Sequence, residues 1–402
     1  MTEWLEKMRV INASGTMTSL GSSSVPAEIS TAIGNVLPMF IDLVRLQKRA
    51  SDVIHRVTGA EAGCITSCAA AGMALGVAAC MVGDDLARAE RLPMGAGTKR
   101  EVILQKGHSV WFGGALPQML RLAGGRVREI GHATRAGAYQ LRAALGEDTA
   151  CAVYVISHHA AQYGMIDLGE FVRVCHEKGV PVIVDAASES SMREIIHYGA
   201  DLICFSGHKF LQGPTSGIMA GTHELIGACL VHLLHGIGRA MKVGKEGIVG
   251  AIAALERWER LDHEGIREQC ESVLEAYVSA IPVEKGVRCS LVDDPTGNPI
   301  RRVRVAVDPS EAGITAFQVA QMLGTLHPPI IVRDDEIDAG YFELDPCNLS
   351  PTDATAVGRE IGRIIAAKES EKEAIRERFS MPPSGADSLY RSLRSIQESE
   401  SS

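Results

Sequence analysis

The middle of the chain alternates short apolar runs with amphipathic segments. The apolar runs predict strands at 102–105, 127–130, 152–156, 182–184 and 202–205. Segments with apolar residues at helical spacing predict helices at 73–82, 110–122, 141–145, 168–175 and 192–198. Nearly continuous apolar strands that alternate with helices are typical of a mainly parallel sheet covered on both faces. We therefore expect an α/β fold.

The segment after residue 166 gives the clearest helix signal. Asp167 and Glu170 have the spacing of a capping box, in which side chains satisfy the first N–H groups of a helix. Apolar residues then recur at helical spacing until Gly179, which is a typical stop signal.

The chain after residue 240 predicts a second, smaller lobe. We expect a long helix or a helix pair at 244–277, strands at 287–292, 303–307, 330–332 and 341–344, and helices at 315–324 and 352–367. A chain of 402 residues is also longer than one typical core. We divide it into an N-terminal arm (1–50), a large domain with the parallel sheet (51–275), a smaller α+β domain (276–370) and a polar tail (371–402).

Composition narrows the class of protein. The net charge of −9 argues against nucleic acid as a partner. Ten cysteines are scattered among apolar neighbours, as expected for reduced thiols in a cytoplasmic protein. Cys64 and Cys68 have no second Cys/His pair nearby, so no metal site is predicted. No apolar segment has the length or flanks of a signal peptide or a membrane span, so we expect a soluble protein without membrane contact.

Two charged residues follow neighbouring strands of the predicted sheet. Asp185 ends the strand at 182–184, and Lys209 follows the strand at 202–205. Parallel sheets bind ligands at the carboxyl ends of their strands, so both side chains should face one site. An amine for a Schiff base and a carboxylate for a pyridinium nitrogen are the groups that pyridoxal 5'-phosphate (PLP) needs. The alternatives are an ordinary surface lysine and an aspartate that caps the following turn.

Small residues before the predicted helix at 73–82 indicate an anion-binding turn. Backbone N–H groups there can converge on a phosphate, and the helix dipole adds to the attraction. The turn consists of Ser67, Cys68 and Ala69. Ser206 and His208, close to Lys209 in the sequence, can add donors to the same phosphate. Close helix packing and local turn stabilisation are the alternatives. The turn matches neither the dinucleotide motif nor the P-loop, which disfavours nucleotide cofactors.

Three histidines and an arginine are further candidates for ligand contact. His108 follows the strand at 102–105, and His158 and His159 follow the strand at 152–156. An imidazole at these strand ends can stack on the pyridine ring, whereas a purely structural polar residue is the alternative. Arg333 ends the strand at 330–332 and can bind a substrate carboxylate through two hydrogen bonds. Its alternative role is an ion pair with one of its acidic neighbours, Asp334, Asp335 or Glu336.

These motifs resemble those of the fold-type I PLP-dependent enzymes, specifically the branch of selenocysteine synthase (L-seryl-tRNA selenium transferase). The segments that carry the resemblance are Ser206-Gly-His-Lys209 with Gly213-Pro-Thr-Ser-Gly217, Val10-Ile-Asn-Ala-Ser-Gly-Thr16, and Pro328-Pro-Ile-Ile331. They are similar to the lysine loop, the N-terminal arm and a small-lobe strand of that branch, and the similarity spans residues 9–366. It implies the fold-type I architecture, Lys209 as the Schiff-base lysine, Asp185 as the pyridinium partner, and a homodimer or larger homo-oligomer.

Departures from the branch indicate the reaction. Cys68 stands where we expect glycine, His208 stands where the tRNA-dependent synthases tend to have an acid, and the shared motif begins by residue 10, without the additional N-terminal domain of those synthases. The chain resembles more closely the D-glucosaminate-6-phosphate ammonia-lyase-like members. This implies α,β-elimination on a hydroxylated amino acid or amino sugar acid, with release of a 2-keto acid and ammonia. Aldolase, racemase and aminotransferase chemistry stay open, as do transfer to aminoacyl-tRNA and a cofactor-binding protein without catalysis.

Overall fold

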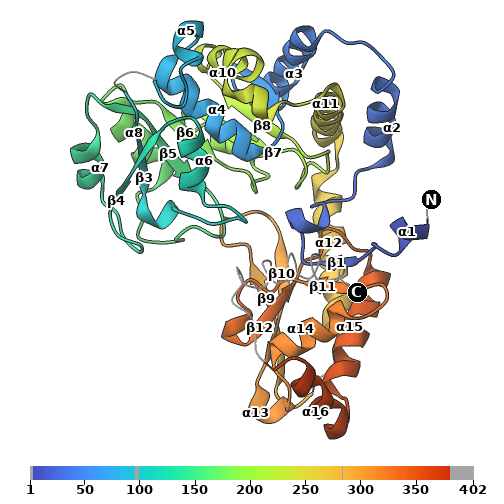
Figure 1. Ribbon diagram of the computed structural model, residues 1–402. Coiled ribbons are helices and arrows are strands. Elements are labelled where there is room, and N and C mark those ends of the chain that lie inside the picture. The colour runs from blue at the N-terminus through green and yellow to red at the C-terminus, as the bar shows by residue number, and fades with distance from the viewer. Residues whose placement is uncertain (1–2, 96–98, 283, 381–402) are drawn as a thin grey trace, which may run out of the picture. The chain divides into compact units, whose positions relative to one another are not determined.

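The computed structural model describes residues 3–95, 99–282 and 284–380, which form two compact units (Figure 1). The large unit comprises Gly21–Leu261, and the small unit comprises Met1–Leu20 with Asp262–Ser402. We describe each unit by itself. The division differs from the expected domains, because the first twenty residues belong to the small unit and the boundary lies at Asp262 rather than at 275.

Strand pairing explains why the N-terminal residues belong to the small unit. Strand β1 (Ile11–Ala13) pairs in parallel with β11 (Ile330–Val332). The expected tail also begins later than residue 371, since α16 (Glu369–Arg378) is a helix whose Ile375 is buried. The rest of the expected tail, from residue 381, lies outside the described residues.

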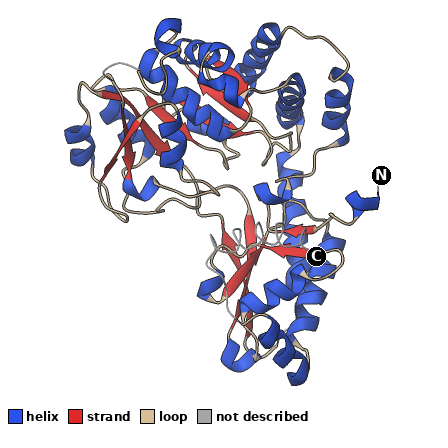
Figure 2. Ribbon diagram, in the orientation of Figure 1, coloured by secondary structure: helices blue, strands red, loops and turns tan. Residues whose placement is uncertain are grey.

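A seven-stranded sheet forms the centre of the large unit (Figure 2). Its order is β2-β8-β7-β6-β5-β3-β4, and the pairs among β7, β6, β5, β3 and β4 are parallel. Strand β8 is antiparallel to both of its neighbours. The strands are β2 (Ala62–Thr66), β3 (Glu101–Gln105), β4 (Arg126–Ile130), β5 (Thr149–Val155), β6 (Val182–Asp185), β7 (Leu202–Ser206) and β8 (Gly217–Gly221). The predicted parallel strands are confirmed, whereas β2 and β8 were not predicted.

Helices cover both faces of this sheet, because successive side chains of a strand point to opposite faces. In β7, Ile203 and Phe205 join the core under α3, α8 and α11, and Leu202 and Cys204 join the core under α4, α6 and α10. The helices of the large unit are α2 (Ala27–Val36), α3 (Leu43–Thr58), α4 (Ala69–Val82), α5 (Leu86–Ala89), α6 (Leu116–Leu122), α7 (Ala138–Ala144), α8 (Leu168–His176), α9 (Met192–Ile196), α10 (His223–His235) and α11 (Lys245–Arg260).

One helix prediction needs correction, and one left open is decided. The helix expected at 110–122 begins only at Leu116, because Gly113 has a positive φ of 97° and Gly113-Gly114 forms a loop instead. The long helix or helix pair expected at 244–277 is a pair, since α11 ends at Arg260. Asp262 caps the second helix, α12 (His263–Ala280), by accepting a hydrogen bond from Gly265 N.

The small unit is an α+β assembly around an antiparallel sheet. The sheet order is β12-β10-β9, from β9 (Val287–Asp293), β10 (Arg301–Val307) and β12 (Tyr341–Leu344). Helices α12 and α15 (Pro351–Ile365) pack against each other, and α14 (Ala316–Gly324) packs on α15. Two short helices, α1 (Glu3–Glu6) and α13 (Pro309–Ala312), complete the unit. Buried Tyr277 and Phe342 fill its core.

Two features of the chain bear on its environment. All ten cysteines are free, and five of them, such as Cys64 and Cys204, are buried within the sheet and its helices. Across the described ranges, every helix is too short or too polar to cross a bilayer.

Candidate active site

The register of the sheet brings the predicted residues to one edge. Val155, Asp185 and Cys204 are aligned across β5, β6 and β7, so the loops after these strands leave the sheet side by side. Gly217, at the start of β8, pairs with Thr66 at the end of β2 and with Ser206 at the end of β7. The anion-binding turn and the lysine loop therefore begin on either side of Gly217.

The lysine loop is held by its own backbone. Gly207 N donates to Ser216 O at 2.9 Å, Gly213 N donates to Gly207 O at 2.8 Å, and Gln212 N donates to Lys209 O at 3.0 Å. These bonds close the loop between β7 and β8 into a compact turn. Lys209 is half-buried, and its Nζ donates a hydrogen bond to Ser188 Oγ at 2.5 Å.

Asp185 lies close enough to Lys209 for their charges to interact. Burial raises the pKa of the Asp185 carboxyl, while the hydrogen bond from Ala187 N and the charge of Lys209 lower it. Only 9% of Asp185 is exposed. Asp185 thus lies among apolar residues at the end of β6, where a cationic ligand would stabilise the charged form of its carboxylate.

Ser188 is a site residue that the sequence interpretation missed. It lies three positions after Asp185, in the loop after β6, and accepts the hydrogen bond from Lys209. A serine in a loop rich in Ala, Ser and Glu gives no distinctive signal. The sequence shows that Ser188 is close to Asp185 along the chain. Only the pairing of β6 with β7 shows that this loop reaches Lys209.

The turn at 67–69, which is predicted to bind an anion, lies at the start of α4. Cys68 is the N-cap residue, and its Sγ accepts from Ala71 N at 3.4 Å. Thr66 Oγ1 donates to Cys68 O at 2.9 Å. A methyl group on Gly217 would lie 2.4 Å from both Cys68 O and Thr66 Oγ1, so glycine is needed for this close approach. Ser67 and Cys68 are half-buried, and the Ala69 side chain is buried.

Two polar residues of the lysine loop are buried beside this turn. Ser206 and His208 are each 7% exposed. The backbone carbonyl of His208 accepts from Ser23 Oγ at 2.8 Å. Its ring Nδ1 has no hydrogen-bond partner among the described residues. Burial and the charge of Lys209 lower the pKa of the His208 imidazole, which favours the neutral ring. The buried Nδ1 of this ring is therefore available to hydrogen-bond a ligand.

The three candidate histidines differ in their surroundings. His108 is 2% exposed, its Nδ1 accepts from Val155 N at 3.1 Å, and its ring meets the edge of Tyr154 at 4.5 Å. Burial lowers the pKa of His108 to about 4. His158 is half-buried and His159 exposed, with ring centres 3.9 Å apart. All three lie in loops at the carboxyl ends of β3 and β5.

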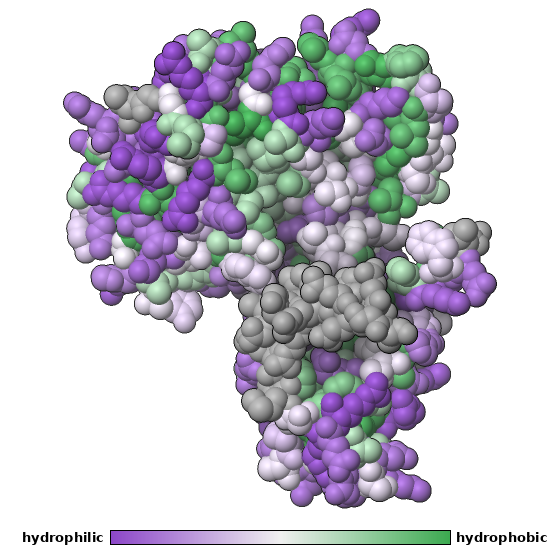
Figure 3. All heavy atoms as spheres, in the orientation of Figure 1, coloured by the Kyte–Doolittle hydropathy of each residue, from purple (hydrophilic) through white to green (hydrophobic). Residues whose placement is uncertain are grey.

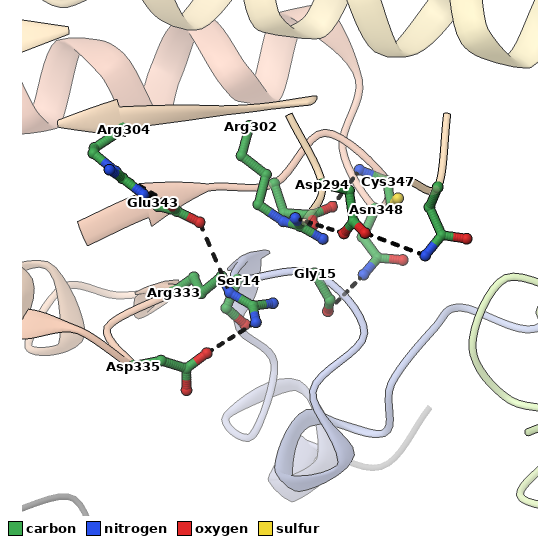
Figure 4. Close-up of polar contacts among 12 residues, drawn as sticks. Ser14, Gly15, Asp294, Arg302, Arg304, Arg333, Asp335, Glu343, Cys347 and Asn348 are labelled. Atoms are coloured by element: carbon green, nitrogen blue, oxygen red, sulfur yellow. Dashed lines mark hydrogen bonds and ion pairs between the residues drawn. The ribbon is translucent and has the colours of Figure 1, made fainter. Parts of the chain in front are cut away.

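Arg333 lies in the small unit, where it has two acidic partners (Figure 4). Its Nη2 is 3.0 Å from Asp335 Oδ2, and its Nε is 4.0 Å from Glu343 Oε2. Arg333 is 8% exposed, and its backbone pairs with that of Glu343. The ion pair that was the alternative interpretation is therefore present within the small unit, with Asp335 as its acid.

The N-terminal segment of the small unit is fastened beside Arg333. Asp345 N donates to Ala13 O at 2.8 Å, and Asn348 Nδ2 donates to Gly15 O at 3.0 Å. Buried Arg302 forms ion pairs with Asp345 at 2.8 Å and Asp294 at 2.9 Å (Figure 4). This network fixes the turn at Gly15, whose φ of 88° favours glycine.

Comparison with known proteins identifies relatives over most of the chain. The family model of L-seryl-tRNA selenium transferase matches residues 10–273. The chain is 38% identical over 338 residues to D-glucosaminate-6-phosphate ammonia lyase of Salmonella typhimurium, covering 84% of this chain and 90% of the relative. It is 37% identical over 361 residues to 5'-C-glycyluridine monooxygenase-decarboxylase of Streptomyces sp., covering 89% of this chain and 90% of the relative.

Solved structures agree with these relatives. The structure of D-glucosaminate-6-phosphate ammonia-lyase matches with a TM-score of 0.80 at 37% identity, covering 91% of this chain and 98% of that one. Aspartate aminotransferase from Thermus thermophilus matches with a TM-score of 0.52 at 14% identity, covering 88% and 91%, which shows the fold alone. The fold is that of the fold-type I PLP-dependent enzymes. The chain belongs to the L-seryl-tRNA selenium transferase family.

Proposed function

We propose that this protein is a PLP-dependent lyase acting on a hydroxylated amino acid or amino sugar acid. The reaction removes the α-proton and the β-hydroxyl as water, and hydrolysis of the resulting enamine then gives a 2-keto acid and ammonia. The observation that carries the proposal is the buried Asp185 beside the half-buried Lys209, at the ends of the adjoining strands β6 and β7, in a chain 38% identical to a relative named for this activity.

The residues present fit PLP. The buried carboxylate of Asp185 would pair with the ring nitrogen, and the amine of Lys209 would hold the aldehyde carbon. The unpartnered Nδ1 of His208, with Ser206 and the turn at 67–69, would bind the phosphate. His108 and His158 would border the ring from the loops after β3 and β5.

The side chains would then divide the work of elimination. PLP supplies an electron sink for the charge that develops at the α-carbon. Asp185 would keep that sink protonated, as its burial makes an unpaired carboxylate costly. Lys209, oriented by Ser188, would take the α-proton and return a proton to the departing hydroxyl. Within the small unit, we propose that Arg333 binds a carboxylate of the substrate in exchange for Asp335.

The test is a substrate screen with two products measured. PLP-reconstituted protein is incubated with D-glucosaminate 6-phosphate, D-glucosaminate and D- and L-hydroxy amino acids, and 2-keto acid and ammonia are quantified together. We expect equal amounts of both from at least one compound. Lys209→Ala should lose turnover and the visible absorbance of bound PLP, while Lys178→Met, which removes an exposed lysine, should keep both. Normal turnover by the Lys209→Ala protein would remove the catalytic assignment.

A second candidate reaction is oxidative decarboxylation. It rests on the 37% identity, over 89% of this chain, to a relative named as a monooxygenase-decarboxylase. Such a reaction consumes O₂ and releases CO₂, whereas elimination needs neither. Oxygen uptake and CO₂ release in the same screen therefore separate the two. Retro-aldol cleavage, racemisation and amino transfer would show as an aldehyde, an inverted enantiomer or a dependence on an added keto acid.

We infer a homo-oligomer from an apolar segment on the large unit. Leu37, Met39 and Phe40 follow α2, and they are 53%, 52% and 105% exposed, with Val44 at 62%. On the face shown in Figure 3, apolar side chains gather on the side of the large unit where α2 lies. Exposed apolar groups in one segment are typical of interaction surfaces. We also propose a cytoplasmic location on account of the ten free cysteines.

A further inference from the structure

Two cysteines contact each other in the small unit. Cys270 lies in α12, and Cys347 follows the end of β12. Their side chains form a hydrogen bond, so the two sulfur atoms lie next to each other. Both residues are half-buried, which leaves them within reach of a small molecule in solution. A dithiol in this position can be oxidised without unfolding of the unit.

Hydrogen bonds around this contact hold the two cysteines in place. Tyr277 lies seven residues after Cys270, on the same side of α12, and its hydroxyl donates to Asp345 O at 3.4 Å. Cys347 N donates to Asp345 Oδ1 at 2.9 Å. Asp345 Oδ2 accepts from the buried Arg302 Nε at 2.8 Å (Figure 4). The segment after β12 is thus fixed against α12, which keeps the sulfur atoms together.

The hydrogen bond makes the two thiols chemically unequal. The bond from the Cys347 thiol lowers the pKa of Cys270, against the opposing effects of burial and of the acids Asp345 and Glu271. Both carboxylates are paired with arginine side chains, which limits their effect. The same hydrogen bond, together with burial, raises the pKa of Cys347. Cys270 is therefore the thiol that becomes a thiolate more readily, and the thiolate is the form that reacts with oxidants.

Other cysteines of the chain show what distinguishes this pair. Cys80 in α4 also has a thiol partner, Cys151, yet that hydrogen bond and burial raise the pKa of Cys80. Cys151 is fully buried in β5. Cys289 in β9 is half-buried like the pair, but burial raises its pKa. Cys270 combines partial exposure and a thiol partner with a hydrogen bond that favours its thiolate.

We propose that Cys270 and Cys347 are a redox-reactive pair that a hydroperoxide converts to a disulfide. The Cys270 thiolate attacks one peroxide oxygen and becomes a sulfenic acid, while the O–O bond breaks and the leaving alkoxide takes up the proton that Cys270 had released. The Cys347 sulfur then bonds to the Cys270 sulfur, and hydroxide leaves with the Cys347 proton as water. The sulfur atoms lose two electrons, and the hydroperoxide gains them as it becomes an alcohol and water.

The disulfide links α12 to the segment that holds the N-terminal residues of the unit. Asp345 N donates to Ala13 O, and Asn348 Nδ2 donates to Gly15 O (Figure 4). Joined covalently to α12, the segment after β12 can no longer separate from that helix. A low-molecular-weight thiol reverses the step by thiol–disulfide exchange. The site is independent of the proposed lyase reaction.

The test uses hydrogen peroxide and the full-length protein, first reduced with dithiothreitol and then freed of the reductant. After exposure to a small excess of peroxide, free thiols are alkylated and each cysteine is assigned by mass spectrometry of proteolytic peptides. We expect the Cys270–Cys347 disulfide as the first product and its loss on renewed reduction. Iodoacetamide should label Cys270 about tenfold faster than Cys289 or more at neutral pH, because the thiolate is the reactive form.

Substitutions separate the roles of the two thiols. Cys347→Ser keeps a hydrogen-bond donor but cannot close the disulfide, so Cys270 should keep its labelling rate and accumulate a sulfenic acid that dimedone traps. Cys347→Ala removes the donor and should slow the labelling of Cys270 about threefold or more, since a thiol is a weak donor. Cys289→Ser, in the same unit, is the control and should leave both the labelling and the disulfide unchanged.

Two results would overturn the inference. The first is oxidation of the cysteines at similar rates without a Cys270–Cys347 disulfide. The second is dimedone capture on Cys347 in the Cys270→Ser protein as fast as on Cys270 in the Cys347→Ser protein, which would show that the two thiols are equally reactive.

Discussion

Burial determines the protonation of the histidines at the candidate site. His108 and His208 both have lowered pKa values because their rings are removed from water. His108 accepts a hydrogen bond from Val155 N through Nδ1, which requires that nitrogen to be unprotonated. A neutral His108 therefore contributes to the alignment of the loop after β3 with the end of β5.

His108 should make stability depend on pH. The pKa of His108 falls from 6.5 to about 4 on folding, so the unfolded chain takes up a proton first as pH decreases. The contribution of His108 to the free energy of unfolding is complete above pH 6.5. As pH falls to 4, this free energy decreases progressively by up to about 3 kcal/mol. Urea unfolding of His108→Asn, which keeps an acceptor but does not titrate, should show a flatter profile over this window. Identical profiles for both proteins would show that another group dominates.

Ser188 should act as a positioning residue for Lys209. Ser188→Ala removes the acceptor of the Lys209 amine, and a hydrogen bond to an ammonium group contributes roughly 1.5–3 kcal/mol. We expect kcat to fall about tenfold or more, with the affinity of the apo protein for PLP within twofold of normal. Ser188→Thr, which retains the hydroxyl, should recover most of the rate. A fall in PLP affinity without a change in kcat would instead indicate a cofactor contact.

Among the elements, β8 determines how the site is assembled. It lies between β2 and β7 with antiparallel pairing, and Gly217 contacts the ends of both neighbours. The absence of a side chain at Gly217 lets the lysine loop and the anion-binding turn approach within van der Waals distance. A parallel neighbour would require a crossover connection, whereas the antiparallel β8 returns directly from Lys209 to this edge.

Gly217→Ala should separate these two segments. The added methyl group would overlap Cys68 O and Thr66 Oγ1 at 2.4 Å, and overpacking of this kind costs about 1–3 kcal/mol. We expect a lower melting temperature and weaker PLP binding. Gly227→Ala is the matched control, because Gly227 lies within α10 with open space around it. That change should stabilise the protein by about 0.5–1 kcal/mol and leave PLP binding unchanged.

The apolar pattern of the sequence predicted the strands whose consecutive residues are buried and the helices that bury one apolar face. Strands β3, β5, β6 and β7 and helix α8 were visible because each is a compact apolar run or stripe between turn signals. Strand β4 is different, because only its Ile130 is buried. Strands β2 and β8 were missed because Ala62-Gly-Cys-Ile-Thr66 and Gly217-Ile-Met-Ala-Gly221 contain small residues that fit under packed helices. The loop at 110–115 was mistaken for a helix because its apolar residues, such as Trp111 and Phe112, remain exposed.

The candidate site could be predicted where strand direction alone determines position. Asp185 and Lys209 follow from the rule that parallel strands present their carboxyl ends together. Ser188 could not be found this way, because its position depends on the register of β6 against β7. The role of Arg333 could not be predicted for a different reason. Its ion pairs with Asp335 and Glu343 explain its burial without any ligand.

For the whole molecule, the exposed segment after α2 predicts self-association. Phe40 is fully exposed, beside Leu37, Met39 and Val44, and water contact with these side chains is unfavourable. A second copy would remove this surface from water, and Phe40→Asp would place a charge in the contact, where its desolvation is costly. Sedimentation velocity should show a dimer or larger species for the unmodified protein and a smaller species for Phe40→Asp at micromolar concentration. Tyr139→Asp, which replaces an exposed aromatic residue elsewhere on the large unit, should leave the distribution unchanged. If both variants sediment like the unmodified protein, the segment after α2 is not the contact.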